Sequence, residues 1–281
     1  MLDLSGWTGG EEHQDDVVDA GLTARFINSL DTPPNSGSLA PQGLHWCLAA
    51  PAIATAQLDK DGHPARGKSS LLPPVPLPRR MWASSEVMFL SPLHIGENVR
   101  RTSRVTEVKE KAGTSGALVF VVIDHVWAGD GGGSLRERQT IVYREPAGEA
   151  APPAPPPLGP NRFRPEPEAI HRVVMPTEAL LFRYSALTFN SHRIHYDLPY
   201  AVGVERYRGL VVQGPLMATL LLDLAYRTYG DQPLTRFAFR GLSPAVAGEP
   251  LHLVLKQNDN RCEFGVYADD GRQVMSAEGA R

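Results

Sequence analysis

The sequence predicts an α+β protein in which a helix and an antiparallel meander of strands occur twice along the chain. Three observations carry this prediction. A short motif is repeated in the two halves, a proline-rich stretch separates them, and a very apolar helical stretch in the second half is followed by strand-like segments. A helix that is apolar nearly all round has to be buried, and a sheet can cover it.

The repeated motif is eight residues long. Residues 90–97 read Leu-Ser-Pro-Leu-His-Ile-Gly-Glu, and residues 242–249 read Leu-Ser-Pro-Ala-Val-Ala-Gly-Glu. An apolar run precedes each copy, and a polar, strand-like segment follows it. The matching context favours an internal duplication, and a repeat fixes the architecture of both halves at once.

A proline-rich stretch at residues 146–167 separates the halves and holds the run Pro-Pro-Ala-Pro-Pro-Pro at 152–157. Proline lacks an N–H and has a fixed φ, so this stretch can join neither a helix nor a central strand. We expect an extended, semi-rigid linker. It divides the chain into an N-terminal domain of residues 1–145 and a C-terminal domain of residues 168–281.

In the N-terminal domain, the apolar residues 44–56 are interpreted as a helix. Residues 119–123, Val-Phe-Val-Val-Ile, are β-branched and aromatic, which is typical of a central strand. The run Asp-Gly-Gly-Gly at 130–133 predicts a turn. The strands are expected at residues 86–90, 99–108, 117–128 and 137–144.

The C-terminal domain has the clearer helix. It begins at Gly214-Pro215, where a missing N–H is harmless, continues through the apolar residues 216–226, and ends near Gly230. A helix wrapped by a curved antiparallel sheet is the hot-dog arrangement. We therefore predict a double hot-dog fold, with two antiparallel sheets that each wrap a long central helix. The strands are expected at residues 236–240, 251–257, 262–267 and 273–279.

The composition excludes several classes of protein. The chain has 281 residues and a formal net charge of −3, which offers no strongly basic field for nucleic acid. Its apolar runs are far shorter than the ~18 residues of a membrane span, and its start does not resemble a signal peptide. Cys47 and Cys262 are expected to be buried thiols. These features predict a soluble, cytoplasmic protein, which we expect to be a homo-oligomer and most simply a dimer.

Residues 184–195 read Tyr-Ser-Ala-Leu-Thr-Phe-Asn-Ser-His-Arg-Ile-His. They resemble the catalytic signature of the MaoC-like acyl-thioester hydratases and dehydratases, which runs aromatic, small residues, Gly-Asp, any residue, Asn-Pro, aliphatic, His. His195 matches the catalytic histidine of that family, and Asn190 stands where most members have an aspartate. His192-Arg193 replaces the usual Asn-Pro.

The departures resemble one branch of the family, which contains mesaconyl- and itaconyl-CoA hydratases and mitochondrial-type 3-hydroxyacyl-thioester dehydratases. Residues 61–64, Asp-Gly-His-Pro, and residues 77–82, Leu-Pro-Arg-Arg-Met-Trp, are typical of the N-terminal domain of that branch. The resemblance covers nearly the whole chain. It implies reversible hydration of an α,β-unsaturated acyl-CoA and a catalytic C-terminal domain. The N-terminal domain lacks an equivalent of His195, so we expect it to be catalytically silent and to shape the acyl pocket.

Hydration of an enoyl thioester requires a base for water, an acid for Cα and a donor for the negative charge on the thioester oxygen. A histidine titrates near neutrality, so His195 is the expected single acid/base. Asn190 cannot take a proton, and we interpret it as orienting the water. Its alternative role is that of a turn residue.

The donor for the thioester oxygen is expected at the start of the helix at 214–226, where free N–H groups and the helix dipole favour an anion. Pro215 has no N–H, so we choose Gly214, which otherwise only permits a tight turn. Gln213 stands where the family often has a histidine and is a possible supporting residue. Asp197 either shares the proton transfer or caps the helix that begins near Leu198.

Six arginines are candidates for binding the substrate. Arg206, Arg208 and Arg240 are candidates for the phosphates of coenzyme A, unless they are simply solvated. Arg66, Arg79 and Arg80 are candidates for the free carboxylate of a dicarboxylic acyl group, because guanidinium and carboxylate pair bidentately. We expect no metal, because His192 and His195 have no evident further ligands. We also expect no cofactor apart from the coenzyme A of the substrate.

Three alternatives stay open at this point. The chain could be a 3-hydroxyacyl-thioester dehydratase of fatty acid metabolism. It could be an acyl-CoA thioesterase, since hot-dog folds also host hydrolysis. It could also be a non-catalytic acyl-CoA-binding protein, and Asn190 in place of an aspartate is the feature that favours this reading.

Overall fold

A computed structural model describes residues 5–33, 37–65, 71–113, 116–148 and 151–281. The helices are α1 (Ala20–Ser29), α2 (Glu178–Leu187), α3 (Leu198–Gly203) and α4 (Gly214–Tyr229), with 3₁₀ turns at Ser5–Trp7, Leu44–Cys47, Thr55–Gln57 and Arg193–His195. The strands are β1 (Glu11–Val17), β2 (Arg79–Ser91), β3 (Asn98–Gly113), β4 (Gly116–Gly129), β5 (Ser134–Arg144), β6 (Ile170–Val174), β7 (Arg236–Gly241), β8 (Leu251–Asn258), β9 (Arg261–Ala268) and β10 (Gln273–Ala280).

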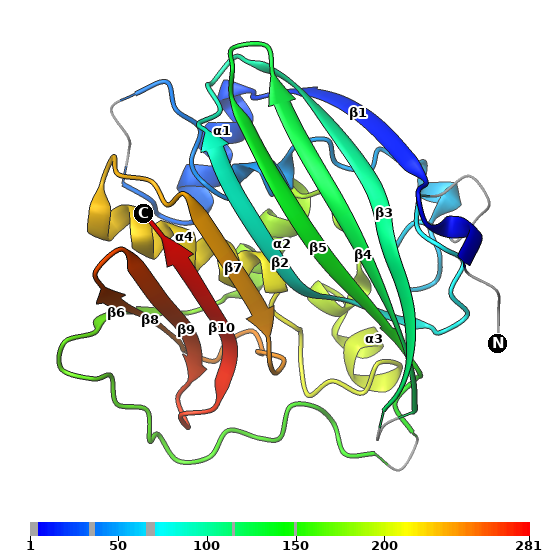
Figure 1. The fold of residues 1–281 in the computed structure, drawn as a ribbon. Coiled ribbons are helices and arrows are strands. Elements are labelled where there is room, and N and C mark those ends of the chain that lie inside the picture. Colours follow the sequence, from blue (N-terminus) through cyan, green and yellow to red (C-terminus); the bar gives the residue numbers. More distant parts are fainter. Residues whose placement is uncertain (1–4, 34–36, 66–70, 114–115, 149–150) are drawn as a thin grey trace.

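The described strands form one antiparallel sheet in the order β1-β3-β4-β5-β2-β7-β10-β9-β8-β6 (Figure 1). Strands β1–β5 come from the first half of the chain, and β6–β10 come from the second half. The two predicted sheets are therefore present, but they join edge to edge at β2 and β7 and continue as one curved sheet. The eight strands expected from the sequence are all found.

The junction of β2 and β7 has the symmetry that a duplication requires. Ser84 pairs with Arg240, Glu86 with Ala238, and Met88 with Arg236. When the repeated motifs are superposed, Ser84 matches Arg236, Glu86 matches Ala238 and Met88 matches Arg240. The pair Ser84–Arg240 therefore maps onto the pair Met88–Arg236, and the pair Glu86–Ala238 maps onto itself. The two copies thus meet across a local two-fold axis, as two subunits of a dimer would.

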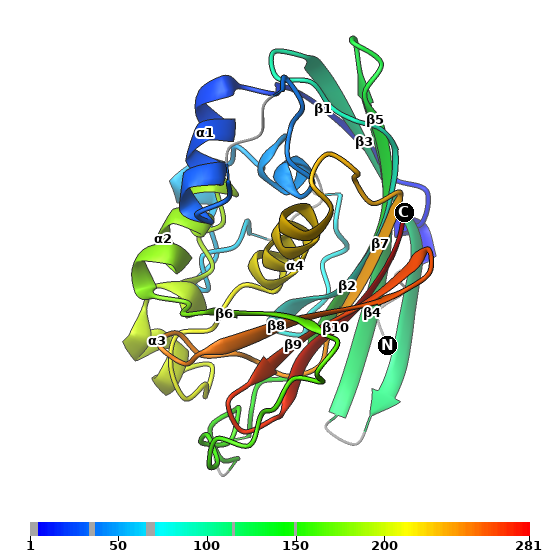
Figure 2. The ribbon, with the colours of Figure 1, turned by 90° about the vertical axis from the view of Figure 1, so that its left-hand side faces the viewer.

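Helix α4 provides the core of the second half. It lies on the concave side of the sheet, between the strands and helices α1 and α2 (Figure 2). Its residues from Leu216 to Ala225 are all buried, and they pack with Phe237, Leu253 and Val266 of the sheet. Pro215 lies in the first turn and Gly230 at the C-terminal cap, as predicted. No helix in the described ranges is long and apolar enough to cross a membrane.

The first half has no counterpart of α4 among its described residues, so the helix predicted at residues 44–56 is wrong. The 3₁₀ turns Leu44–Cys47 and Thr55–Gln57 occupy this stretch, with Ala49 at φ 48° and Pro51 between them. The Ala40 N–H donates to Leu93 O, as the Val212 N–H donates to Ala245 O just before α4. The turn at Leu44–Cys47 therefore stands where a central helix would begin. Without that helix, the concave face of β2–β5 is left open for a cavity.

The proline-rich segment is extended, as its composition predicts. From Glu145 to Ala169, apart from residues 149 and 150, which lie outside the described ranges, the chain forms no helix or ladder strand. This segment is not a free spacer, because it contacts the C-terminal domain. The N–H groups of Arg162 and Phe163 donate to Asp269 O, and Phe163 is buried against the ring of His252. The segment is thus docked along the C-terminal domain.

Candidate active site

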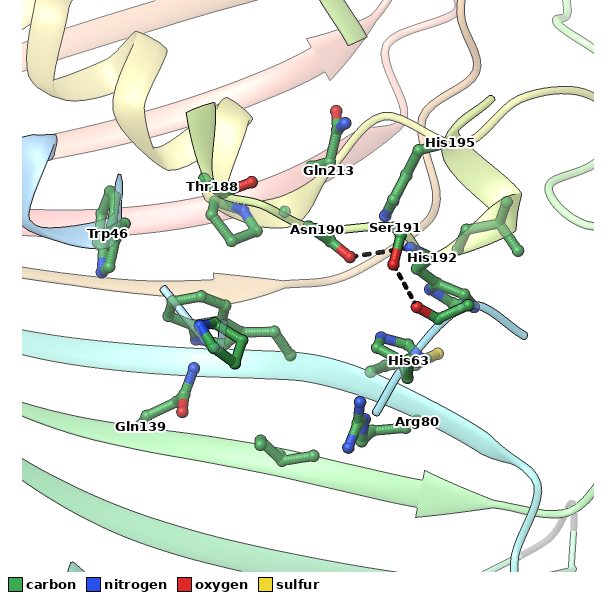
Figure 3. A pocket seen from close by; sticks show the side chains of 18 of the residues that line it. Trp46, His63, Arg80, Gln139, Thr188, Asn190, Ser191, His192, His195 and Gln213 are labelled. Atoms are coloured by element: carbon green, nitrogen blue, oxygen red, sulfur yellow. Dashed lines mark hydrogen bonds between the residues drawn. The ribbon is translucent and has the colours of Figure 1, made fainter. Parts of the chain in front are cut away.

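A cavity of about 2730 Å³ lies between the concave face of the first half of the sheet and the segment that leads to α4. Both halves of the chain line it, as the close view in Figure 3 shows. The first half contributes Trp46, His63, Arg80 and Gln139. The second half contributes residues 188–192, His195 and the start of α4.

His195 lies in the 3₁₀ turn Arg193–His195 and is buried at the wall of this cavity. Its Nδ1 lies 2.6 Å from the carbonyl oxygen of Val211, which can only accept, so Nδ1 carries the hydrogen and Nε2 keeps a lone pair. Burial lowers the pKa of His195 to about 4, although the Val211 carbonyl opposes this shift. The ring is therefore uncharged at neutral pH and can accept a proton at Nε2.

Asn190 has the properties of a turn residue. Its Oδ1 accepts the main-chain N–H of His192 at 3.0 Å, and its own N–H donates to Ser185 O at 2.9 Å. Phe189 before it has φ 50°, so the chain turns sharply there. Asn190 lines the cavity, but its oxygen is engaged. The side-chain NH₂ is the part that remains to contact a water or a substrate.

The start of α4 lies at the same cavity. Gly214 and Pro215 line it, and Gly214 donates no hydrogen bond to the main chain of the described residues. The amide of Gln213 does not cap the helix. It donates instead to Leu181 O and Ser185 Oγ, both at 2.9 Å, and so fastens α2 to the start of α4. Gln213 is therefore a support for the Gly214 turn.

Asp197 has the capping role that the sequence left open. Its Oδ1 accepts the N–H of Tyr200 at 3.1 Å at the start of α3, and its Oδ2 pairs with Arg193 at 2.7 Å. Asp197 is not among the residues that line the cavity. A part in proton transfer does not fit this position.

The candidate arginines lie in different surroundings. Arg79 is buried, pairs with Glu205 at 2.8 Å and stacks on Tyr207, so its charge is already balanced. Arg208 is held by Glu249 and does not line the cavity. Arg206, which donates to Ala151 O, and Arg240 of β7 both line it. Arg66 lies outside the described residues.

Arg80 differs from the other candidates. Its side chain lies in the cavity close to His63 (Figure 3). No carboxylate of the described residues lies within ion-pairing distance of it. A guanidinium that lines the cavity opposite the candidate base, and has no carboxylate partner among the described residues, is suited to an anionic group on the substrate.

The loop of residues 59–64 brings a second histidine to the site. The ring Nδ1 of His63 forms a hydrogen bond with Asp61 Oδ2, at 2.8 Å. The ring of His63 lies 4.1 Å, centroid to centroid, from that of His192, which in turn lies 5.5 Å from that of His195. Burial, His63 and His195 hold the pKa of His192 below its usual range. The sequence motif had marked this loop as typical of a family branch but had assigned it no role.

One ligand-type atom from each of Asp61, His63 and His192 lies within 4.8 Å of the others. Such a group has the residue types of a metal centre. However, the two Asp61 oxygens already accept the main-chain N–H of His63 at 2.9 Å and its ring Nδ1 at 2.8 Å. We therefore interpret the group as a hydrogen-bonded Asp–His pair beside a third ring. The absence of a metal stays a prediction.

Gly62 joins this loop to the catalytic segment. It has φ +88°, and an added Cβ would lie 1.9 Å from Ser191 O. The Ser191 hydroxyl donates to Gly62 O at 2.5 Å, and the Arg193 N–H donates to Asp61 O at 2.9 Å. The two halves of the chain are thus locked together at the site.

We expect Gly62→Ala to lower the free energy of unfolding by about 3 kcal/mol or more, because a left-handed backbone alone costs an alanine about 1–3 kcal/mol and the clash adds to it. Gly132→Ala is the matched control, since Gly132 has φ +94° and no atom within 4 Å of an added Cβ. Urea unfolding of both variants measures the difference. Equal losses would contradict the close packing of the two segments.

Comparison with known proteins is consistent with this geometry. Residues 43–247 match the family described as hydroxyacyl-thioester dehydratase type 2. A mesaconyl-C(4)-CoA hydratase of Chloroflexus aurantiacus is 39% identical over 278 residues, which is 98% of this chain and 96% of the relative.

Two solved structures show the same fold at low sequence identity. One described as a MaoC-like dehydratase has a TM-score of 0.74 and 15% identity, and covers 99% of both chains. A Mycobacterium tuberculosis protein described as having a double hot-dog fold has a TM-score of 0.60 and 13% identity, over 97% of this chain and 95% of that one. The predicted double hot-dog fold is confirmed.

Proposed function

The chain belongs to the hydroxyacyl-thioester dehydratase type 2 family of hydro-lyases, and on that premise we propose that its substrate is a short, dicarboxylic α,β-unsaturated acyl-CoA of the mesaconyl type. The observation that carries the proposal is the position of Arg80. This guanidinium lies in the cavity that His195 lines and has no carboxylate partner among the described residues.

The acyl chemistry explains why such a position matters. In mesaconyl-C(4)-CoA the free carboxylate is attached to the β-carbon, which is the atom that water attacks. The cation that binds the carboxylate must therefore line the same cavity as the base, within reach of the β-carbon. Arg80 is on β2 below the rings of His63 and His192, on the opposite wall of the cavity from His195 (Figure 3).

The proposed reaction starts at His195. Its Nε2 takes a proton from water while the oxygen forms a bond to Cβ. The electron pair of the double bond moves to Cα, and negative charge grows on the thioester oxygen. The Gly214 N–H, at the positive end of α4, is the proposed donor to this oxygen. His195 then gives this proton to Cα, which yields the 3-hydroxyacyl thioester, and the dehydration follows the same path in reverse.

A second candidate is the dehydration of longer 3-hydroxyacyl thioesters, which the family description names. The size of the cavity favours it, since Leu118, Phe120 and Ile123 of β4 extend an apolar wall beyond the site. A five-carbon mesaconyl group would leave that wall uncovered. We rank this candidate second because it gives Arg80 no partner.

A panel of CoA thioesters tests the proposed function. Mesaconyl-C(4)-, itaconyl-, crotonyl- and a long-chain enoyl-CoA are compared by the loss of enoyl-thioester absorbance, with free thiol followed in parallel. We expect the highest kcat/KM for a dicarboxylic substrate and no thiol release. A preference for the long chain would favour the second candidate. Thiol release without hydration would identify a thioesterase, and binding without turnover a non-catalytic protein.

A further inference from the structure

We propose that the cavity has a second binding subsite away from the catalytic residues, in which Glu137 and Gln139 of β5 bind an uncharged hydrogen-bonding group at the distal end of an acyl chain. A hydroxyl is the simplest such group. The inference goes beyond the proposed function, because it concerns acyl chains longer than a mesaconyl group. It also gives a definite form to the expectation that the first half of the chain shapes the acyl pocket.

A belt of polar side chains crosses the first half of the sheet on the face that lines the cavity. Ser103 of β3 pairs with His125 of β4, and His125 in turn pairs with Glu137 of β5. Gln139 follows on the same face of β5, and all four residues line the cavity. In the second half the matching face is apolar and packs on α4. A polar belt in the place of a core face therefore calls for a ligand or a structural partner.

The belt lies at a distance from the catalytic residues. Gln139 pairs with Ser85 of β2, which lies about 15 Å further along that strand than Arg80 for the usual rise of a strand. Figure 3 shows the same separation, with Trp46 and Gln139 on one side of the pocket and Arg80 on the other. A short acyl group held at Arg80 does not reach the belt, so its occupant has to be the far end of a longer chain.

Two polar atoms of the belt have no hydrogen-bond partner among the described residues. Glu137 Oε1 accepts from Trp46 Nε1 at 3.1 Å and from Ser85 Oγ at 2.5 Å, whereas its Oε2 accepts from neither. Gln139 Oε1 accepts from His125 Nε2 at 3.2 Å, and the NH₂ of Gln139 is left without an acceptor. Buried polar groups are ordinarily paired, so these two atoms are available to a ligand.

A hydroxyl group matches both atoms. It can donate its hydrogen to Glu137 Oε2 while its oxygen accepts from the NH₂ of Gln139. The two residues are next but one on the same strand, so their side chains point to the same face from Cα atoms about 7 Å apart. One group between them can therefore contact both.

The electrostatics of the belt favour an uncharged group. Burial raises the pKa of Glu137 to about 7, against the hydrogen bonds that it accepts and the charge of Arg101, so a carboxyl and a carboxylate form are both present near neutral pH. A hydroxyl bonds to either form. Burial lowers the pKa of His45 to about 3 and that of His125 to about 4, so both rings are uncharged. The ionised form of Glu137 would repel a carboxylate on the acyl chain, and Arg101 already supplies the positive charge that faces it.

Isothermal titration calorimetry with saturated acyl-CoAs tests the subsite, because these thioesters have no double bond to hydrate. Decanoyl-CoA is compared with ω-hydroxydecanoyl-CoA and with the ω-carboxylated chain of the same length. We expect the hydroxylated chain to bind about tenfold more tightly than decanoyl-CoA, as one or two net hydrogen bonds produce. The carboxylated chain should bind more weakly than the hydroxylated one, and the difference should grow as the pH rises through the pKa of Glu137.

Gln139→Met and Glu137→Met keep the length of the side chain and remove its hydrogen-bonding atoms. Each variant should lose most of the preference for the hydroxylated chain and bind decanoyl-CoA at least as tightly as the wild type does. Arg138→Met is the matched control, because Arg138 lies between the two residues on the exposed face of β5, where it pairs with Asp124. It should keep the preference. The preference is a ratio of two affinities in one preparation, and thermal unfolding shows which variants are folded.

Several results would overturn the proposal. They are a wild-type protein that binds decanoyl-CoA as tightly as the hydroxylated chain, one that binds the carboxylated chain most tightly, one that binds none of the three, or a preference that survives in Gln139→Met. The titration needs no turnover, so it is independent of the thioester panel. A protein that prefers the hydroxylated chain but hydrates none of the panel would refute the proposed function and leave the subsite standing.

Discussion

His195→Gln is expected to lower kcat/KM for hydration by about 10³-fold, within the range that removal of a general base produces. The glutamine amide can replace the hydrogen bond from Nδ1 to Val211 O, but it cannot take a proton. The loss should therefore appear mainly in kcat, with KM little changed. Steady-state kinetics with the best substrate of the thioester panel measure it.

The pH dependence provides a check on the same residue. Because the pKa of His195 is lowered to about 4, the ring is already unprotonated from neutrality down to about pH 5, and the wild-type rate should not fall over that range on its account. Activity that His195 controls is lost only as the pH drops through about 4. A His195→Gln variant that keeps more than a tenth of the wild-type rate would rule out this residue as the base.

His195→Ala separates the chemistry from the packing. It leaves the Val211 carbonyl, a buried acceptor, without its side-chain partner, which typically costs about 1–3 kcal/mol of stability. We expect the glutamine and alanine variants to be equally inactive and to differ in thermal unfolding. The Val211 N–H bonds to Ile194 O in either case, so the segment should keep its path.

Local patterns predicted most of the fold. The strands of both meanders and helix α4 were found where apolar residues, turn residues and helix ends placed them. The helix predicted at residues 44–56 is absent because Gly43 has φ +94° before the stretch and Pro51 interrupts it; its apolar residues are buried up to Ala49 and exposed from Ala52 onward. An apolar composition alone does not show whether a stretch is helical. The absence of a helix here goes with the cavity on the concave face of β2–β5. The expected dimer and the cytoplasmic location stay predictions.

The residues of the site also fall into two groups, one that a local sequence motif predicts and one that only the tertiary structure brings to the site. His195, Asn190 and Gly214 belong to one continuous stretch of sequence and its following helix, so a motif could place them together. Asp61 and His63 reach the site across the interface of the two halves, and nothing local indicates that contact. The signal that could have marked them is the run Asp-Gly-His-Pro, because a carboxylate two residues before a histidine can bind its ring around a glycine turn.

Arg80 was one of six candidate arginines, and the sequence could not rank them. Whether a guanidinium is free depends on its tertiary partners: Glu205 holds Arg79 and Glu249 holds Arg208. Arg80 follows Arg79 directly in β2, and both residues line the cavity. One of them meets Glu205, and the other is left for a ligand.

Arg80→Gln should therefore change specificity more than catalysis. A hydrogen-bonded charge pair contributes about 1.5–3 kcal/mol, so we expect kcat/KM for the dicarboxylic substrate to fall about 10- to 150-fold. Crotonyl-CoA has no second carboxylate, so its rate should change by less than threefold. The ratio of the two rates in one preparation of the variant measures the effect and corrects for any partly unfolded protein.

Arg80→Lys sharpens the test, because lysine keeps the charge but cannot bind a carboxylate through two parallel hydrogen bonds. It should recover part of the loss if charge alone matters and little of it if bidentate binding does. An equal fall for both substrates in Arg80→Gln would show that Arg80 acts on the shared thioester chemistry, for example through the charge it places beside His63 and His192. The carboxylate would then have to be bound elsewhere in the cavity, and Arg206 and Arg240, which also line it, would be the next residues to replace.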